Sequence, residues 1–339
     1  EETGGFHYPG PWRGWTFNRD DAHEKLNHRL QMAERIVRMS LREKLAKGKF
    51  VITSELGPPK GVDVAKTLAE ARAMGPHVDA MNVTDLQGGV MKLGSIALCR
   101  LLIDEGIEPV FQLTAASRNR LAIQSDLLSA YVLGIRNVLL LGGDPPKVGD
   151  HPDAKPVYDL DTMGLFQAAK SLKEGKDLAG KELEGAPKDL LIGGAANPVV
   201  DDLETERQKT EKKIELGCEF FQTQAVFDPP LYEKFLSKVK VKTPFLVGII
   251  VLKSAKMAQF MNDHIPGIRV PQALIQEIDA AADKKKKAVE IAARLIQALK
   301  PTAQGFHLMP IGSGELIPEI LEAAGLTKPV SSWGRFSRG

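Results

Sequence analysis

The stretch AMNVTDLQGGVMKLGSIALCRLLIDEGIEPVFQLT, residues 80–114, contains one full strand–helix–strand unit of the predicted fold. An apolar run at 80–84 ends in polar residues, helical periodicity follows at 93–106, and a second apolar run covers 108–114. Two strands joined through a helix pair in parallel, because the helical crossover brings the second strand back beside the first. This unit therefore predicts a parallel sheet covered by helices.

The same alternation of a short apolar run and an amphipathic stretch repeats along the chain. The predicted strands are residues 50–54, 80–84, 108–114, 137–141, 190–195, 220–224, 245–250 and 306–310. The predicted helices are 62–74, 93–106, 118–134, 161–174, 203–217, 229–240, 254–262 and 314–324, with two more at 271–281 and 284–299. Eight strands that are each followed by a helix predict an α/β protein with a (β/α)8 TIM-type barrel. An open, doubly wound sheet would carry a GxGxxG turn after its first strand, where residues 55–59 read Glu-Leu-Gly-Pro-Pro instead.

The ends of the chain do not follow this alternation. Residues 1–18 have the composition of an extended arm, and 19–47 read as a long helix that ends at Gly48. We therefore divide the chain into an N-terminal arm and helix at 1–48, a catalytic barrel at 49–330 and a C-terminal tail at 331–339.

Composition narrows the class of protein. The 339 residues are 43% hydrophobic and 26% charged, with a net charge of only +2, so no basic field indicates nucleic acid or a membrane surface as partner. The run Lys284–Lys287 is best interpreted as the solvated start of an amphipathic helix. Two distant cysteines and no apolar run of about 20 residues favour a soluble protein of the reducing cytoplasm.

Polar residues follow most of the predicted strands directly. In a (β/α)8 barrel the carboxyl ends of the strands meet at one mouth, where the active site lies. The residues expected there are Glu55, Thr84, Asp85, Gln112, Thr114, Gly142, Gly143, Asp144, Asn197, Gln222, Thr223, Gln224 and His307. The sequence therefore predicts a barrel enzyme with a polar mouth.

Two carboxylates, Glu55 and Asp144, are expected at this mouth. A carboxylic acid that is shielded from water can keep its proton and act as a general acid. The alternative is that each carboxylate only caps a helix or pairs with a lysine. The glycines at 142–143 favour a functional role for Asp144, because glycine lets a flat ligand approach the backbone closely.

Other candidates have simpler interpretations at this stage. Glu206 and Lys213 lie seven residues apart on one helix face, a spacing that is also typical of a solvated surface. His307, at the end of an apolar strand, is expected to be a hydrogen-bonded barrel histidine and not a catalyst. No HExxH, paired CxxC or carboxylate cluster at metal spacing occurs, so we predict no metal site.

A set of ordered motifs resembles the flavin-dependent methylenetetrahydrofolate reductases. TSELGPPKG at 53–61 is similar to the Glu-x-x-Pro-Pro opening of that family. The other motifs follow in the family's order and are NVTD (82–85), QLTAASRNR (112–120), LLLGGDPP (139–146), GDHPDAKPVYDLD (149–161), GGAANP (193–198), FFQTQAVFD (220–228) and GIIVLKSAKMAQFMNDHIPGIRVP (248–271). The resemblance covers residues 49–325, and the ordered set is more specific than any single motif.

The resemblance implies a cytoplasmic oxidoreductase of one-carbon metabolism that binds a flavin, FAD in preference to FMN, at its mouth. It would reduce methylenetetrahydrofolate to methyltetrahydrofolate or catalyse the reverse oxidation. By this resemblance Glu55 is the general acid that opens the five-membered ring, and Asp144 and Gln224 bind the folate. The flavin contacts that it implies come from Thr84, Gly143, Tyr158, Ala195, Asn197, Glu206 and Lys213.

Some positions depart from the family's pattern. Gln112 stands where a histidine is common, and Ala255 stands where well-known members have a phenylalanine that stacks against nicotinamide and folate in turn. Because nicotinamide stacks best on a flat aromatic surface, the electron donor is left open between NAD(P)H and a partner protein. A homo-oligomer is compatible with the sequence. Two alternatives to the reductase are a flavin-less folate-binding barrel or methyltransferase subunit, and an electron-transfer flavoprotein subunit of a larger complex.

Overall fold

The computed structural model describes residues 39–265 and 267–327. Eight parallel strands form a closed barrel in sequence order, and the last pairs with the first. They are β1 (Val51–Leu56), β2 (Ala80–Val83), β3 (Pro109–Thr114), β4 (Asn137–Leu141), β5 (Leu191–Ala196), β6 (Phe220–Ala225), β7 (Phe245–Ile250) and β8 (Gly305–Met309). The predicted (β/α)8 barrel is confirmed, and every predicted strand end lies within two residues of the observed one.

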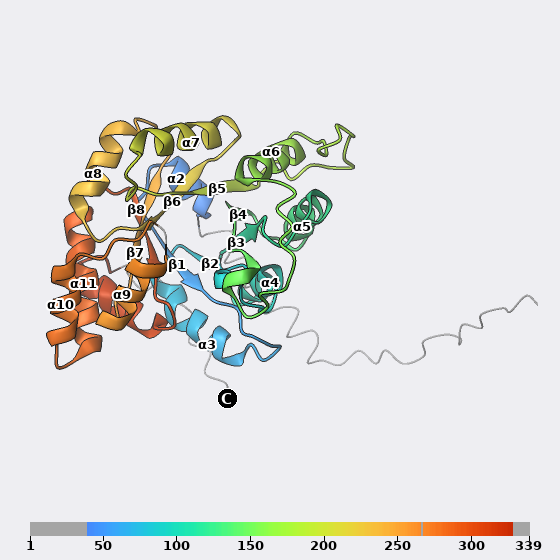
Figure 1. Cartoon of the computed structure of the whole chain (residues 1–339). Helices are drawn as coiled ribbons and strands as arrows, with labels where there is room; N and C mark the ends of the chain where they lie inside the picture. The colour runs from blue at the N-terminus through green and yellow to red at the C-terminus, as the bar shows by residue number, and fades with distance from the viewer. Residues whose placement is uncertain (1–38, 266, 328–339) are drawn as a thin grey trace, which may run out of the picture. The chain divides into compact units, whose positions relative to one another are not determined.

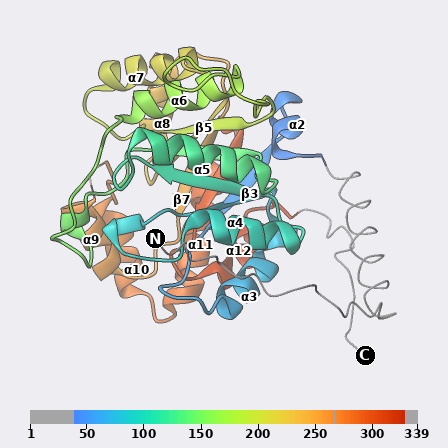
Figure 2. The ribbon, with the colours of Figure 1, turned by 90° about the vertical axis from the view of Figure 1, so that its right-hand side faces the viewer.

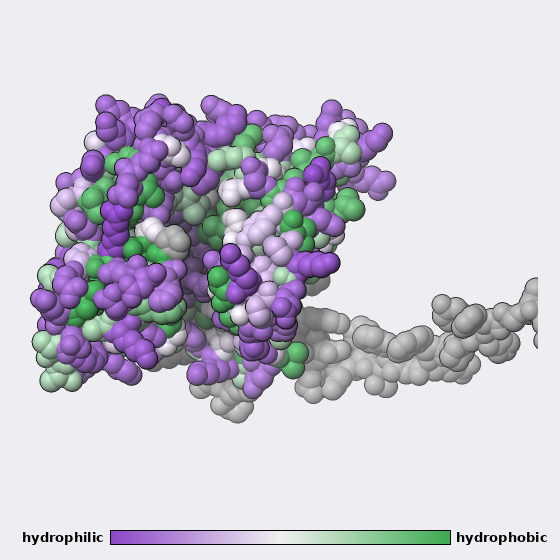
Figure 3. All heavy atoms as spheres, in the orientation of Figure 1, coloured by the Kyte–Doolittle hydropathy of each residue, from purple (hydrophilic) through white to green (hydrophobic). Residues whose placement is uncertain are grey.

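Helices surround the strands (Figures 1 and 2). Those that follow β1 to β6 are α3 (Ala65–Met74), α4 (Ser95–Asp104), α5 (Arg120–Val132), α6 (Thr162–Lys173), α7 (Leu203–Glu215) and α8 (Pro229–Lys238). Three helices separate β7 from β8, namely α9 (Ala255–His264), α10 (Gln272–Ala280) and α11 (Lys284–Leu299), and α12 (Ile317–Ala323) follows β8. The two extra helices predicted before the last strand are thus α10 and α11. Hydrophilic residues cover most of the face in Figure 3, and hydrophobic residues lie between them in small separate groups.

The prediction of one long helix over residues 19–47 is wrong in one respect, because a separate helix, α2, begins at Leu41. Ser40 has extended backbone angles (φ −64°, ψ 163°) and caps α2 (Leu41–Ala46) through a reciprocal capping box with Glu43. The helix ends before Gly48, which has φ +61°, as predicted. The rest of that prediction, at 19–38, lies outside the described residues, as do the predicted arm at 1–18 and the tail at 331–339.

Helix α2 covers the amino-terminal end of the barrel. Leu41 is fully buried and packs with the lowest interior layer, formed by Val51, Ala80, Val110, Leu139, Leu191, Phe220 and Leu246. The Leu41 amide donates to both carboxylate oxygens of Glu108 at 3.0 Å, and Lys44 pairs with Asp79 at 2.8 Å. Among the described residues this end of the barrel is therefore closed by packing, and a ligand site is expected at the carboxyl ends of the strands.

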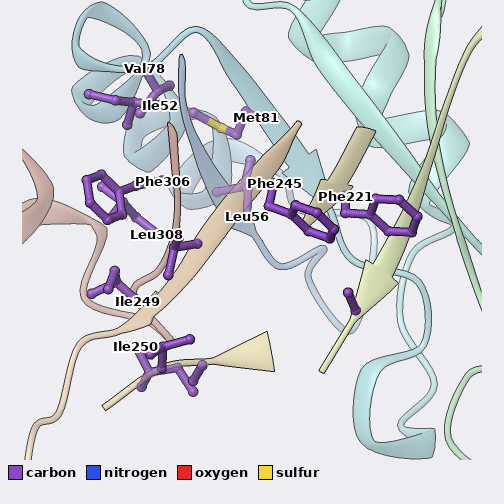
Figure 4. Packing of buried hydrophobic residues seen from close by; sticks show 14 of the residues in the cluster. Ile52, Leu56, Val78, Met81, Phe221, Phe245, Ile249, Ile250, Phe306 and Leu308 are labelled. Carbon is purple, nitrogen blue, oxygen red and sulfur yellow. The ribbon is translucent and has the colours of Figure 1, made fainter. Parts of the chain in front are cut away.

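The larger core lies between the strands and the helices. Figure 4 shows part of it, in which Ile52 and Leu56 of β1 lie near Phe306 of β8 and Phe245 of β7. Phe221 and Phe245 stack with ring centroids 5.0 Å apart. Since alternate strand residues face outward into this core, the residues between them face into the barrel.

Both cysteines are buried, and their thiols should be unreactive in the folded protein. Burial raises the pKa of Cys99, and it raises the pKa of Cys218 to about 12. At pH 8 the thiolate fraction of Cys218 is then about 1,000-fold smaller than that of an ordinary thiol. We expect no reaction with Ellman's reagent before unfolding and two equivalents in denaturant. A thiol that reacts rapidly in the native protein would contradict this packing.

Candidate active site

Three predicted site residues face into the barrel at its carboxyl end. Counting by two along each strand from the lowest interior layer leads from Val51 to Glu55, from Ala80 to Thr84 and from Leu191 to Ala195. Each therefore belongs to the uppermost interior layer. The parallel register of the closed barrel brings them to one mouth, as the sequence predicts.

A hydrogen-bonded polar layer lies directly below this mouth. Asn82 and Gln222 exchange two amide hydrogen bonds across the barrel, at 2.7 and 3.0 Å. Gln222 Nε2 also donates to Thr53 Oγ1 at 3.1 Å, and Thr53 Oγ1 lies 2.9 Å from His307 Nδ1. The layer joins strands β1, β2, β6 and β8, and it supports the residues above it in a single arrangement.

Glu55 lies on top of this layer and is mostly buried. Its Oε1 accepts a hydrogen bond from Gln112 Nε2 at 3.2 Å and lies 3.6 Å from His307 Nε2. The other possible acceptor for the Thr53 hydroxyl, the Phe306 carbonyl, is 3.5 Å away. The shorter contact favours donation from Thr53 to His307 Nδ1, so that the imidazole N–H is on Nε2 and points to Glu55. Glu55 thus lies between Gln112 and His307.

The other predicted carboxylate, Asp144, lies in the loop that follows β4. It is exposed, and its Oδ2 accepts a hydrogen bond from the Gly88 amide at 2.7 Å. Both carboxylates lie at the carboxyl end of the barrel, but no hydrogen bond or ion pair joins Asp144 to Glu55 in the described part of the chain. The two carboxylates therefore belong to separate groups of residues at the mouth.

Gly143 is required by its own backbone and by its neighbours. Its φ is +82°, and a Cβ at this position would lie 2.7 Å from Thr114 Cβ and 3.1 Å from Ala116 Cβ. Tyr158, which also has a positive φ of 40°, donates from its hydroxyl to the Gly143 carbonyl at 3.1 Å. The structure thus brings together two predicted flavin contacts, Gly143 and Tyr158, and it explains the glycine by close packing on β3.

A β-bulge sets the position of Gln224. The register of β6 against β7 shifts between Gln222 and Ala225, and Thr223 Oγ1 accepts from the Gly248 amide at 2.9 Å in place of a ladder bond. A Cβ at Gly248 would lie 2.4 Å from the Thr223 carbonyl, so only glycine fits beside the bulge. Bulges re-aim the side chains next to active sites, and this one decides where the Gln224 side chain points.

Three loops of the mouth are tied together around Asp150. Its carboxylate binds the Lys60 ammonium, accepts from the Met91 amide at 2.9 Å and lies 2.9 Å from His151 Nδ1. The hydrogen bond from Lys60 is the largest of the effects that hold the pKa of Asp150 well below its usual range. Asp150 therefore connects the loops after β1, β2 and β4.

Asp85 holds the end of β3 from below the mouth. Its Oδ2 accepts from the Thr114 amide at 3.0 Å, from Thr114 Oγ1 at 2.7 Å and from Arg118 Nη1 at 2.6 Å. Arg118 also binds Asp126 at 2.8 Å. Because Thr114 packs against Gly143, this buried ion pair supports the loop that carries Asp144.

The last four predicted flavin contacts form a separate group at the end of β5. Lys213 Nζ donates to the Ala195 carbonyl at 2.6 Å, and Glu206 Oε1 accepts from the Asn197 amide at 2.8 Å. Glu206 and Lys213 are each only 8% exposed, so their interpretation as a solvated surface is wrong. Burial lowers the pKa of Lys213. Both helix residues thus bind the strand end on which a ligand would rest.

Thr84 carries a polar atom that the described residues leave unsatisfied. Its side chain is buried, and its Oγ1 has no hydrogen-bond partner among residues 39–265 and 267–327. Buried hydroxyls without a partner are rare, because desolvation is then uncompensated. This atom marks a place where a bound group would find a hydrogen-bonding partner.

Reasoning from the sequence missed the partners of Glu55. The sequence predicts both Gln112 and His307 at the mouth, but it does not identify either of them as a partner of Glu55. His307 is indeed buried and hydrogen-bonded, but it also lies beside Glu55. The signal in the sequence was the two-residue period of a strand, which puts Thr53 and Glu55 on the same interior face. In a closed barrel the last strand, with His307, pairs with the first.

The structure is a (β/α)8 barrel with a mostly buried carboxylate, Glu55, at the carboxyl ends of the strands. This is the end at which (β/α)8 barrel enzymes have their active sites. Residues 40–325 match the methylenetetrahydrofolate reductase family, so the chain belongs to that family. In the described residues no three His, Cys, Asp or Glu side chains are arranged to hold a metal ion. None of the helices described is long and apolar enough to cross a membrane.

Curated relatives carry the same family name. Methylenetetrahydrofolate reductase 2 of Schizosaccharomyces pombe is 26% identical over 319 residues, which cover 85% of this chain and 47% of that protein. A probable methylenetetrahydrofolate reductase (NADPH) of Caenorhabditis elegans is 22% identical over 66% of this chain and 33% of its own length. The chain thus spans less than half the length of these relatives.

Among solved structures, an uncharacterized protein from Clostridium thermocellum that binds two copies of 5-methyl-5,6,7,8-tetrahydrofolic acid has the same fold. The TM-score is 0.57 at 17% identity, over 84% of this chain and 98% of that one. This likeness supports the barrel assignment independently of the sequence motifs.

Proposed function

We propose that this chain is a flavin-dependent methylenetetrahydrofolate reductase that interconverts methylenetetrahydrofolate and methyltetrahydrofolate. The observation that carries the proposal is the placement of Glu55 at the mouth of a barrel of this family, held by Gln112 and near His307. The test is turnover by the purified chain with added flavin, measured as oxidation of methyltetrahydrofolate by an artificial electron acceptor. A chain that binds flavin and folate but shows no turnover would contradict the proposal.

The mouth has features that fit a flavin. Thr84 offers a buried hydroxyl without a partner among the described residues, and Gly143 and Tyr158 form a hydrogen-bonded unit at the same end of the barrel. Ala195, Asn197, Glu206 and Lys213 would hold the far part of the cofactor, with FAD favoured over FMN. When bound, the flavin supplies the hydride that the reaction needs.

Glu55 would supply the proton. Reduction adds a hydride to the methylene carbon and breaks the bond from that carbon to one ring nitrogen, which takes up a proton as it leaves. A carboxylic acid beside that nitrogen donates the proton, and the resulting carboxylate keeps its hydrogen bond from Gln112. Gln112 suits both states, because its amide donates to a carboxylate and accepts from a carboxylic acid.

We predict that Asp144→Asn and Gln224→Leu weaken folate binding by about tenfold or more and leave flavin affinity within about twofold. The pterin edge presents donors and acceptors that a carboxylate and an amide complement. Among the described residues, each side chain accepts a hydrogen bond from one backbone amide only, Asp144 from Gly88 and Gln224 from Ala225, so both have further capacity to bind a ligand. Titration of each variant with methyltetrahydrofolate checks this. Parental folate affinity in either variant would remove that residue from the site.

We also predict that NADH reduces the bound flavin slowly and that a protein or low-potential carrier reduces it faster. Ala255, the first residue of α9, offers nicotinamide a methyl group where an aromatic ring would stack. The nearby Lys253 is engaged by the Ile311 carbonyl. Stopped-flow mixing of the isolated chain with NADH and with NADPH decides the matter, because rapid and saturable bleaching by either one contradicts the prediction.

A further inference from the structure

Lys92 is a half-buried lysine at the mouth that no prediction assigns to the site. It lies in the loop between β2 and α4, and no hydrogen bond or ion pair engages its ammonium within residues 39–265 and 267–327. Its backbone is fixed on both sides, since the Met91 amide donates to Asp150 at 2.9 Å and the Leu93 amide donates to the Pro59 carbonyl at 2.9 Å. The backbone around Lys92 is therefore held in place, while the described neighbouring side chains do not neutralise its ammonium.

The ammonium of Lys92 and the hydroxyl of Thr84 flank one small space above Gly57. A Cβ placed on Gly57 would lie 3.7 Å from Lys92 Nζ and 3.9 Å from Thr84 Oγ1, and it would contact nothing else within 4 Å. Gly57 itself is exposed. Two separate hydrogen-bond donors thus lie within 4 Å of this one position, and the hydroxyl is the buried, unsatisfied one described above.

This space lies next to the general acid. Gly57 follows Glu55 by two residues in the ELGPP segment at the end of β1. Three acidic side chains of the surrounding loops are bound to other groups: Asp85 to Arg118, Asp144 to the Gly88 amide, and Asp150 to Lys60. An unneutralised cation beside an unsatisfied hydroxyl favours an anionic oxygen as the bound group.

We propose that Lys92 and Thr84 form an anion-binding part of the ligand site, with Lys92 Nζ bound to a carboxylate or phosphate oxygen of the ligand. The identity of that ligand rests on the proposed function, under which the oxygen belongs to the folate's glutamate or to the flavin's phosphate. Lys213 differs from Lys92 in this respect, because its ammonium is buried and already donates to the Ala195 carbonyl. Lys92 supplies a charge that Lys213 does not expose.

The first experiment measures binding of four probes to the full chain and to Lys92→Gln. Riboflavin and FMN differ by a phosphate, and methyltetrahydropterin and methyltetrahydrofolate differ by the tail that carries the glutamate. We expect Lys92→Gln to weaken one charged probe by about tenfold or more and its uncharged counterpart by less than about twofold. Weaker binding of FMN identifies the flavin phosphate as the group that Lys92 binds. Weaker binding of methyltetrahydrofolate identifies the folate carboxylate instead. The control is Lys256→Gln, because Lys256 is an exposed lysine at the start of α9. This variant should bind all four probes as the parent does.

The second experiment blocks the space without removing the charge. Gly57→Ala makes only ordinary contacts with Lys92 and Thr84, so thermal unfolding should not change, yet its methyl group lies where the ligand would approach. Gly61→Ala, in the same loop and with nothing within 4 Å, is the matched control. We expect weaker binding of the same charged probe for Gly57→Ala and parental binding for Gly61→Ala.

The outcomes separate this inference from the proposed function. If the parent chain binds no flavin and no folate, the proposed function and the inference fail together. If the parent binds flavin and folate, and Lys92→Gln binds each of the four probes as tightly as the parent does, the anion-binding role of Lys92 is wrong. The reductase proposal then stands.

Discussion

Replacing Glu55 with glutamine should lower folate turnover by at least ~10²-fold while flavin binding and flavin reduction persist. Glutamine has the size of glutamate and can still accept the hydrogen bond from Gln112, so the polar layer below it should remain intact. An amide cannot donate the proton that the leaving nitrogen requires. The measurement compares steady-state turnover with the rate of flavin reduction in the same preparation.

A matched control for this variant is Glu315→Gln. Glu315 lies after β8 at the same end of the barrel, is exposed, and forms only a 3.8 Å ion pair with Lys285. It should keep parental turnover. Normal turnover in Glu55→Gln would remove Glu55 from the chemistry, whereas loss of flavin binding in that variant would point to a structural defect instead.

The largest effect on stability is expected from Asp85→Ala, which should lower the free energy of unfolding by about 3–5 kcal/mol. The Asp85 side chain is 1% exposed, and its partner Arg118 is 17% exposed. Removing the carboxylate leaves a mostly buried guanidinium without its closest partner and leaves the Thr114 amide without an acceptor. Chemical denaturation followed by circular dichroism measures the difference.

Asp126→Ala tests whether burial is the reason. Asp126 binds the same arginine at 2.8 Å, but its side chain is 35% exposed. An exposed ion pair of this kind contributes about 1 kcal/mol or less. If Asp85→Ala and Asp126→Ala lowered the free energy of unfolding equally, burial of Asp85 would not explain its contribution to stability.

The fold could be predicted because its determinants are local and repeated. Each strand is a short apolar run, and each helix shows apolar residues at helical spacing. Eight such strand–helix units in order can pack in only a few ways. The ends of the predicted strands placed Glu55, Thr84 and Gln224 at the mouth, since position along a parallel strand fixes the end of the barrel that a residue occupies. The interruption at Ser40 escaped prediction, because a capping serine is easily read as one more polar residue of an amphipathic helix.

The neighbours of each site residue could not be predicted. Contacts across the barrel, such as Asn82 with Gln222, depend on the stagger of the strands, which hydrophobic patterning does not encode. The bulge at Gln224 and the Lys213 bond to Ala195 are tertiary features of the same kind. For that reason the sequence identified which residues reach the mouth, while the structure was needed to find what orients Glu55.

The most direct test of the account is a single turnover under anaerobic conditions, in which the chain with reduced flavin is mixed with methylenetetrahydrofolate. We expect the visible absorbance of oxidised flavin to return with formation of one methyltetrahydrofolate per flavin, and we expect Glu55→Gln to fail to restore it. A parent chain whose reduced flavin stays reduced in the presence of bound methylenetetrahydrofolate would contradict the proposed reductase function.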